Sequence, residues 1–338
     1  MASPTRWGII SAGKISSDFV NALKVSDFKE EHQVVAVAAR NINSAKAFAD
    51  KFGISRTYGS YDQLAADPEI DAVYLGAIHP VHLTITKMLI NSGKSVLCEK
   101  PMGMNLRETQ EMVDLAREKG VFLMEAMWSW FNPAHKKLRE ELASGKIGEV
   151  FQAHATFGVQ ISEVERLAVK DLGGGATLDI GIYVIAFSQL VFGGQEPTKI
   201  IASGHLNQDG VDESMGAVLT YPSGKTATIT VHTRVEMPCE AEVFGTKGRA
   251  KLSSPFWCSR QLSFNDGKEK ISFDYNESEI PFNFWNSSYL SLEAQHVREC
   301  LQKGLKESPV VTFNDTLLFA KIMENIRKQI GVKYVQDE

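Results

Sequence analysis

The sequence predicts an α/β fold, in which a doubly wound parallel sheet is followed by an α+β domain with an open-faced, mainly antiparallel sheet. Up to about residue 130, short continuous apolar runs alternate with helix-like segments, as in parallel strands that are covered on both faces. Beyond that point the strand-like runs are longer and one alternates in polarity, which is typical of an antiparallel strand with one solvated face.

The first domain is predicted to span residues 1–126. Its apolar runs predict strands at residues 7–11, 34–39, 72–76, 95–99 and 121–125. Apolar residues at helical spacing predict a helix over residues 15–23 and others at 43–52, 82–91 and 105–119. Asn43 or Ser44 is the expected cap of the second helix, and Gly93 follows the end of the third.

The second domain is predicted to span residues 127–338. Helices are expected at 133–143 and 176–192, and strands at 148–157, 199–207, 213–221, 226–233 and 240–245. In the run 226–233, threonines and His232 occupy one face and Ala227, Ile229 and Val231 the other, so we expect a half-buried antiparallel strand. Turns fit residues 222–224 and 245–248.

Composition excludes several classes of function. The 338 residues allow two domains, and 43% hydrophobic with 23% charged residues is an ordinary globular profile. A net charge of −5 disfavours nucleic-acid and membrane-surface partners, because both need a basic face. We see no membrane span and no signal peptide. The four cysteines lie far apart without metal-ligand spacing, so we expect reduced thiols, a cytoplasmic location and no metal.

A degraded dinucleotide-binding turn lies between the first strand and the first helix. Where three glycines are usual, this chain has Ser11, Gly13 and Ser16. Lys14 and Ile15 lie between Gly13 and Ser16 and are further candidates for contact with the cofactor. Gly13 keeps the position at which the backbone approaches a pyrophosphate, and the helix amino terminus supplies amides. The alternative is a tight strand-to-helix turn without a ligand.

Arg40 indicates the type of dinucleotide. It follows the second strand, where domains that prefer NAD usually have an acidic residue for the ribose hydroxyls. An arginine can bind a 2′-phosphate with two parallel hydrogen bonds, helped here by Ser44 and Lys46. The prediction is therefore NADP, unless Arg40 merely faces solvent.

Lys100, Asp179 and Tyr183 are the candidate chemical groups. Lys100 lies in Glu99-Lys100-Pro101, at the carboxyl end of a buried strand, where open α/β sheets bind ligands. Asp179 and Tyr183 are four residues apart in an apolar helix that follows a run of three glycines. An ammonium near a phenol lowers the phenol pKa, which suits Tyr183 to proton transfer. The alternatives are a solvated lysine and a core Asp and Tyr.

Further candidates are histidines and aromatic residues. His79 and His82 follow the strand at 72–76, and His82 is a candidate for orienting substrate or cofactor unless it only caps a helix. Core packing accounts for the aromatic residues near the domain junction, but Trp128 and Phe157 are also candidate walls for a ring-shaped substrate. The remaining members of that group are Trp130 and Phe131.

The ordered motifs resemble the Gfo/Idh/MocA oxidoreductase family. They are Gly8-Ile9-Ile10-Ser11-Ala12-Gly13, Glu99-Lys100-Pro101, Met124-Glu125-Ala126, and Gly173-Gly174-Gly175 through Asp179-Ile180-Gly181. The resemblance implies a Rossmann domain that binds NADP, and a second domain that forms a homodimer through its sheet. It implies Tyr183 as acid/base with Lys100 beside the cofactor, supported by Asp179 and His82. Further cofactor contacts are expected from Tyr74, Gly76, His79, Glu99 and Pro101.

The resemblance extends over the whole chain to a subgroup that oxidises trans-dihydrodiols of aromatic hydrocarbons, D-xylose and related aldoses with NADP. Most relatives have His where this chain has Tyr183, Pro-Asn where it has Ile78-His79, and Arg-Phe where it has Trp130-Phe131. Three alternatives stay open: a non-catalytic NADP-binding regulator, an enzyme that forms a Schiff base on Lys100, and a sugar or dicarbonyl reductase of the same family.

Overall fold

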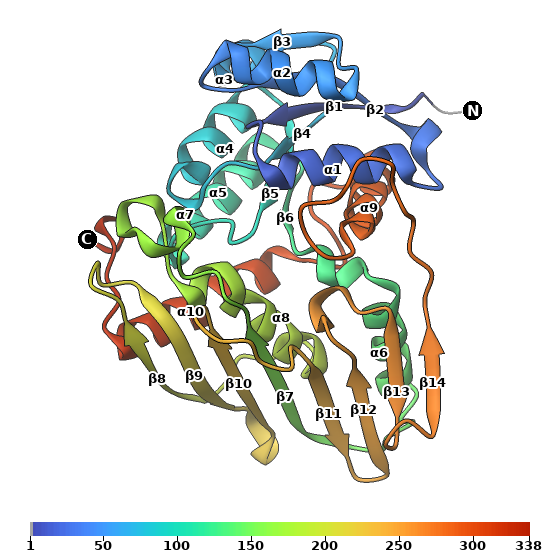
Figure 1. Cartoon of the computed structure of the whole chain (residues 1–338), viewed down its shortest axis with the longest axis vertical. Helices are drawn as coiled ribbons and strands as arrows, with labels where there is room; N and C mark the ends of the chain where they lie inside the picture. The colour runs from blue at the N-terminus through green and yellow to red at the C-terminus, as the bar shows by residue number, and fades with distance from the viewer. Residues whose placement is uncertain (1–2) are drawn as a thin grey trace. The chain divides into compact units, whose positions relative to one another are not determined.

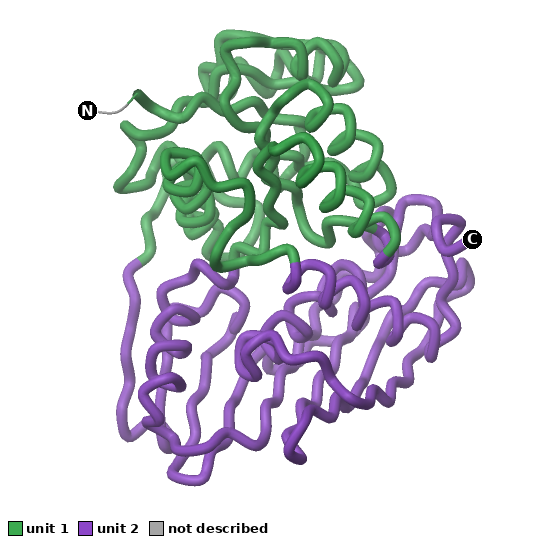
Figure 2. Tube along the Cα trace, turned by 180° about the vertical axis from the view of Figure 1, so that it is seen from behind, with its two compact units in different colours: residues 1–103, 107–128, 275–313 green, residues 104–106, 129–274, 314–338 purple. Residues whose placement is uncertain are grey.

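The computed structural model describes residues 3–338 as two compact units with one sheet each (Figure 2). Unit 1 comprises residues 3–103, 107–128 and 275–313, and unit 2 comprises residues 104–106, 129–274 and 314–338. These units differ from a single division after residue 126, because the segment 275–313 returns to pack with the N-terminal part of the chain.

Unit 1 contains a six-stranded parallel sheet, which confirms the doubly wound fold predicted for the first part of the chain. The strand order is β3-β2-β1-β4-β5-β6, so the direction of winding reverses between β1 and β4. Ligands bind at the carboxyl ends of the strands beside such a reversal. The strands are β1 (Thr5–Ile10), β2 (His32–Ala38), β3 (Arg56–Tyr58), β4 (Ala72–Leu75), β5 (Ser95–Glu99) and β6 (Leu123–Ala126).

Helices cover both faces of this sheet, which explains why its strands are continuous apolar runs (Figure 1). On one face, Leu75 belongs to the same buried cluster as Leu89 and Met112 of the covering helices. On the other, the Phe19 ring stacks on Tyr74 with centroids 3.9 Å apart. The helices are α1 (Lys14–Val25), α2 (Ile42–Phe52), α3 (Tyr61–Ala65), α4 (His82–Asn91), α5 (Leu106–Lys119) and α9 (Leu290–Gln302).

The cap of α2 corrects one prediction. Its N-cap is Asn41, whose side chain accepts a hydrogen bond from the Asn43 backbone N–H at 2.8 Å. Asn43 and Ser44 therefore lie inside the helix. An asparagine oxygen that binds an N–H two residues later satisfies a donor that the helix itself cannot pair.

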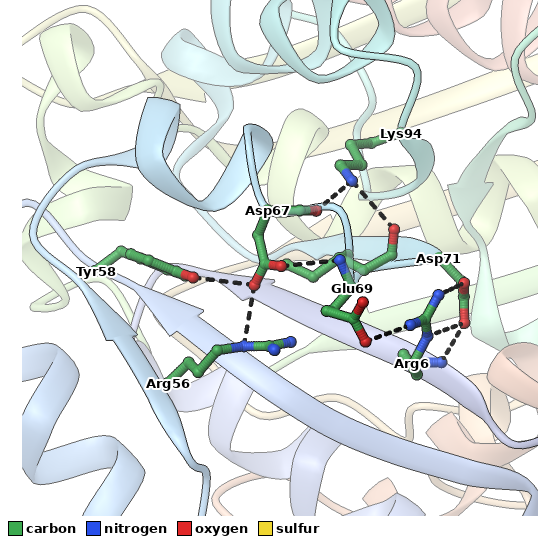
Figure 3. Close-up of polar contacts among 8 residues, drawn as sticks. Arg6, Arg56, Tyr58, Asp67, Glu69, Asp71 and Lys94 are labelled. Carbon is green, nitrogen blue, oxygen red and sulfur yellow. Dashed lines mark hydrogen bonds and ion pairs between the residues drawn. The ribbon is translucent and has the colours of Figure 1, made fainter.

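Ion pairs and hydrogen bonds fix the loop 66–71, which leads into β4 (Figure 3). The Asp67 carboxylate accepts a hydrogen bond from the Tyr58 hydroxyl at 3.0 Å and pairs with Nε of Arg56 at 3.0 Å. The buried Lys94 ammonium donates to two backbone carbonyls of this loop, and burial lowers the pKa of Lys94. Because the loop precedes β4 and Lys94 precedes β5, these contacts lie away from the ligand-binding edge of the sheet.

Unit 2 contains an eight-stranded sheet of order β14-β13-β12-β11-β7-β10-β9-β8, which confirms the open, mainly antiparallel sheet. One detail differs: β10 is antiparallel to β9 but parallel to β7. The alternation predicted along β10 is present, with Ala227, Ile229 and Val231 buried and Thr228 exposed. The strands are β7 (Val150–Gly158), β8 (Lys199–Leu206), β9 (Asp212–Thr220), β10 (Thr226–His232), β11 (Ala241–Gly245), β12 (Gly248–Leu252), β13 (Gln261–Phe264) and β14 (Glu269–Ser272).

One face of the unit 2 sheet is covered by helices (Figure 1). They are α6 (Pro133–Ala143), α8 (Ile182–Val191) and α10 (Phe313–Ile330), while the short α7 (Glu165–Ala168) precedes the glycine run. The helix expected over residues 176–192 is not uniform, because Thr177–Gly181 is π-helical before α8 begins. Lys170–Val191, which includes α8, is apolar and long enough to cross a membrane, although we expected no membrane span. The residues of its most apolar window are 94% buried, as in the core helix of a globular unit.

Candidate functional site

The predicted dinucleotide turn lies at the winding reversal of the unit 1 sheet. Ser11 adopts a φ of 80°, a left-handed conformation that usually requires glycine, and its N–H donates to the Ala38 carbonyl at 2.9 Å. Gly13 is the N-cap of α1. The turn therefore adjoins the ends of both β1 and β2, as a dinucleotide-binding turn must.

Three features show that this turn fits a pyrophosphate. The Ser16 hydroxyl is fully buried in the first turn of α1 and has no protein partner. A Cβ at Gly76, directly after β4, would overlap that hydroxyl. At Gly13, in contrast, a Cβ would meet only Ser11 Oγ at 3.5 Å and a carbonyl oxygen at 3.9 Å. The protein itself would tolerate a side chain at Gly13, so the space that glycine leaves beside the helix amino terminus is open to an approaching phosphate.

Arg40 is exposed two residues beyond β2. Burial raises the pKa of Tyr61, and the positive charge of Arg40 acts to lower it, so the two side chains lie close enough to interact. Because the Ser11 N–H binds the Ala38 carbonyl, Arg40 is in the region where the ribose of a dinucleotide would lie. Lys14, exposed, and Ile15, half-buried, begin α1 beside the same turn.

Lys100 follows β5 directly and is half-buried. The buried carboxylate of Glu99 accepts hydrogen bonds from the Tyr74 hydroxyl at 2.5 Å and from the Lys100 backbone N–H at 3.2 Å. Tyr74 has no accessible surface, so the structure places it in the core below the strand end. Glu99 and Tyr74 thereby fix the backbone from which Lys100 projects.

His82 is completely buried between the loops that follow β4 and β5. Its Nδ1 lies 3.0 Å from the Pro101 carbonyl oxygen, and its Nε2 lies 3.0 Å from that of Ala77. Burial lowers the pKa of His82, whereas its contacts with the two backbone carbonyls act to raise it. His79 lies edge-on to it, with ring centroids 5.9 Å apart. The ring of His82 thereby contacts the backbone of both loops.

In unit 2, the glycine run brings its backbone close to other groups before the π-helical turn. Gly175 has a φ of 120°, and a Cβ there would lie 2.5 Å from Asp212 Oδ1 and 2.9 Å from the Tyr334 hydroxyl oxygen. The Asp212 carboxylate accepts hydrogen bonds from the Thr177 N–H and hydroxyl at 2.7 and 2.6 Å. Burial raises the pKa of Asp212. These contacts fix the segment that carries Asp179, and π-helical turns are frequent at functional sites.

Asp179 has a partner that the sequence analysis missed. Nη1 of Arg166, in α7, donates to Oδ1 of Asp179 at 2.7 Å, and Nη2 lies 3.5 Å from Oδ2. The Asp179 side chain is 7% exposed and that of Arg166 is 40% exposed. A forked arginine of this kind fixes the orientation of a carboxylate. The sequence did not predict this pair, because Arg166 lies 13 residues before Asp179 and no local pattern connects the two.

Tyr183 lies against an aromatic cluster on the same unit. Its ring centroid is 5.8 Å from Phe157 and 6.2 Å from Trp257, and these two rings stack at 3.7 Å. Trp257 was also missed, although the Phe256-Trp257 doublet between two strands was a usable signal. Trp130 belongs elsewhere, because its indole N–H donates to the Ala186 carbonyl at 3.2 Å and its ring meets Phe319 edge-on.

The predicted site residues therefore form two groups. Unit 1 brings together the residues at the strand ends, and unit 2 brings together Asp179, Tyr183 and Phe157 near Arg166 and Trp257. Trp128 is buried in unit 1. The unit 1 group consists of Ser11, Gly13, Lys14, Ile15, Arg40, Tyr74, Gly76, His79, His82, Glu99, Lys100 and Pro101. No group of three or more His, Cys, Asp or Glu able to hold a metal occurs within residues 3–338.

Comparison with protein families decides the class. Residues 5–127 match an oxidoreductase family with an NAD-binding Rossmann fold, and residues 135–251 match the GFO/IDH/MocA C-terminal domain. The chain belongs to the Gfo/Idh/MocA family. As a member of this family it is an oxidoreductase that binds a nicotinamide dinucleotide, which confirms the resemblance stated from its motifs.

Relatives of known name match the chain over almost its whole length. The trans-1,2-dihydrobenzene-1,2-diol dehydrogenase of Danio rerio is 47% identical over 332 residues and covers 98% of both chains. That of Xenopus tropicalis is 46% identical over 330 residues, which is 98% of this chain and 99% of the relative. The mouse enzyme of the same name is 46% identical over 333 residues, with the same two coverages.

Solved structures share the architecture. A 3-ketoreductase from Actinomadura kijaniata, in complex with NADP and TDP-benzene, has a TM-score of 0.82 at 25% identity and covers 98% of this chain and 99% of its own. A levoglucosan dehydrogenase in complex with NADH and levoglucosan has a TM-score of 0.82 at 18% identity and covers 97% of each chain, which shows the fold alone.

Proposed function

We propose that this protein is an NADP-dependent dehydrogenase that oxidises trans-dihydrodiols of aromatic hydrocarbons, D-xylose and related aldoses. The observation that carries the proposal is the 44–47% identity over 98% of the chain to relatives named trans-1,2-dihydrobenzene-1,2-diol dehydrogenase. The aromatic cluster around Tyr183 supports it, because stacked rings form an apolar wall for a cyclic diol.

The chain's own residues would hold NADP as follows. The amides at the start of α1 and the Ser16 hydroxyl would bind the pyrophosphate, and Gly13 leaves room for it. Arg40 would bind the 2′-phosphate, which distinguishes NADP from NAD. His79 and Lys100 lie at the strand ends beside this turn, where the nicotinamide half of a dinucleotide binds.

A bound nicotinamide supplies the hydride acceptor. In the proposed oxidation the substrate gives its hydride to the nicotinamide, and the Tyr183 phenolate would take the proton of the substrate hydroxyl. The Lys100 ammonium would favour that phenolate by lowering the pKa of Tyr183. Asp179, oriented by Arg166, would accept a hydrogen bond from a neighbouring substrate hydroxyl. His82 would act indirectly by positioning the Pro101 loop.

The test is a panel of dihydrodiols and sugars with NADP and NAD, followed by the absorbance of reduced nicotinamide. Tyr183→Phe should lower kcat about 10²–10⁴-fold, the usual contribution of a general acid/base, while the Kd for NADPH stays unchanged. Tyr58→Phe is the matched control, since its hydroxyl binds Asp67 in the loop before β4. Retention of most activity by Tyr183→Phe would refute its role.

The same panel, extended with carbonyl compounds and NADPH, distinguishes the alternatives. A regulator would bind NADP without turning over any substrate, and a reductase would act only on carbonyl compounds with NADPH. Borohydride added with a carbonyl substrate would attach it covalently to Lys100 only in a Schiff-base enzyme, because hydride transfer leaves no adduct.

We also propose that the protein is a cytoplasmic homodimer. The face of the unit 2 sheet opposite its helices exposes Ile201 and Val218, which pair across β8 and β9. If this face joins two copies, the parent chain should sediment as a dimer and an Ile201→Asp variant as a monomer. The four cysteines are free thiols and buried, which supports a reducing compartment; fractionation of cells tests it.

A further inference from the structure

We propose that Trp285 covers the bound dinucleotide from the segment 280–286, which lies against the start of α1. The inference rests on the dinucleotide binding proposed above and adds a contact from a distant part of the chain. Asn283 comes 269 residues after Lys14, with which it forms a hydrogen bond. Neither the glycine turn nor the strand ends indicate this contact.

The buried carboxylate of Asp18 holds this segment on α1. It accepts hydrogen bonds from the Asn283 backbone N–H at 2.9 Å, the Asn283 side-chain amide at 2.7 Å and the Phe284 N–H at 2.9 Å. The Asn283 amide also reaches the Lys14 carbonyl oxygen at 3.3 Å. Since Lys14 directly follows Gly13, residues 283 and 284 lie beside the first turn of α1. Figure 1 shows this orange segment passing along α1.

Further hydrogen bonds fix the segment on both sides of Trp285. Before it, the Asn21 amide donates to the Ile280 carbonyl at 2.8 Å. After it, the Ser287 hydroxyl donates to the Phe284 carbonyl at 3.0 Å, and Asn286 has a φ of 51°, which turns the chain. Trp285 is therefore presented by a preformed loop, so little ordering opposes ligand binding.

The exposure and the position of Trp285 together point to the dinucleotide as the ligand that this side chain covers. Trp285 is 58% exposed and Phe284 is 42% exposed, whereas the four other tryptophans are at most 5% exposed. Adjacent exposed aromatic rings mark a contact surface. Trp285 comes two residues after Asn283, which contacts Lys14, and two residues span at most about 7 Å of extended chain. Trp285 is therefore within reach of the phosphate-binding turn. In that turn the buried Ser16 hydroxyl lacks a protein partner. An indole face can stack on a nucleotide ring or cover its ribose.

The experiment measures quenching of tryptophan fluorescence by acrylamide, with and without saturating NADP⁺. Because Trp285 alone is well exposed among the five tryptophans, it dominates the quenching of the free protein, and Trp285→Phe identifies its signal by removing it. We expect saturating NADP⁺ to lower the quenching constant of Trp285 severalfold. Calorimetry on the parent chain shows separately whether NADP⁺ binds at all, so failure of the proposed function is distinguished from failure of this inference.

Three variants complete the test. Trp285→Ala should raise the Kd for NADP⁺ roughly tenfold, which corresponds to about 1.4 kcal/mol. Phe151→Ala, at a phenylalanine in unit 2 that is 42% exposed, should leave the Kd unchanged. Asp18→Ala removes both acceptor oxygens and should release the segment. Trp285 should then stay accessible to acrylamide in the NADP⁺ complex, while circular dichroism checks that the variant folds. NADP⁺ binding that shields nothing at Trp285, together with an unchanged Kd in Trp285→Ala, overturns the proposal.

Discussion

Arg40→Asp provides the sharpest test of cofactor choice. Arg40 lies two residues beyond β2, and its charge reaches Tyr61 at the start of α3. The substitution replaces a cation that can bind a 2′-phosphate by an anion that repels it. The same carboxylate can accept hydrogen bonds from the two ribose hydroxyls of NAD.

The expected magnitude follows from the exposure of Arg40. A hydrogen-bonded pair with a charged partner contributes about 1.5–3 kcal/mol, and solvent screening keeps an exposed pair near the lower end. Loss of about 1.5 kcal/mol weakens NADP binding roughly tenfold. Repulsion of the phosphate and improved binding of NAD each act in the same direction, so the ratio of NADP to NAD affinity should fall about 100-fold or more.

The assay is a titration of NADP⁺ and NAD⁺ by calorimetry at low and high salt. The preference of the parent chain should weaken with salt, because an exposed ion pair is screened. Lys119→Asp serves as control: it changes the net charge equally at the end of α5 and should leave the ratio unchanged. An unaltered ratio in Arg40→Asp would mean that Arg40 only faces solvent.

Three further predictions concern the interior of each unit. Lys94→Met should lower the free energy of unfolding by about 2 kcal/mol in urea titrations without changing NADP binding, because two buried carbonyls lose their donor. Burial lowers the pKa of His135 from 6.5 to about 3. The unfolded chain therefore takes up this proton first as pH falls, and stability should decrease by about 1.4 kcal/mol per pH unit between 6.5 and 3. His135→Gln should flatten that part of the pH profile in urea titrations; an unchanged slope would assign it to other groups. Arg166→Met should raise the substrate KM about tenfold with the Kd for NADP unchanged, because the Asp179 carboxylate loses the two hydrogen bonds that orient it. The same KM in the variant and the parent chain would contradict a role of Arg166 in positioning Asp179.

Much of the fold could be predicted from local patterns. The run Ser95–Glu99 and the helix His82–Asn91 have the predicted bounds, because continuous apolar residues and helical spacing are local signals. The short β3 and the strands beyond β11 were missed, since three to five residues with mixed polarity carry little pattern. The π-helical turn at Thr177–Gly181 was also missed, because its apolar residues follow the same pattern as the α-helix into which it continues.

The sequence by itself determined the family, the dinucleotide turn and the chemical types of the candidate groups at Arg40, Lys100 and Tyr183, because motif spacing and residue type are local. Only the tertiary structure decided which groups meet. It paired Asp179 with Arg166, buried His82 between two carbonyls, and brought the segment of Trp285 back to α1. Contacts between residues far apart in the chain follow from how sheets and helices pack, and no local pattern encodes them.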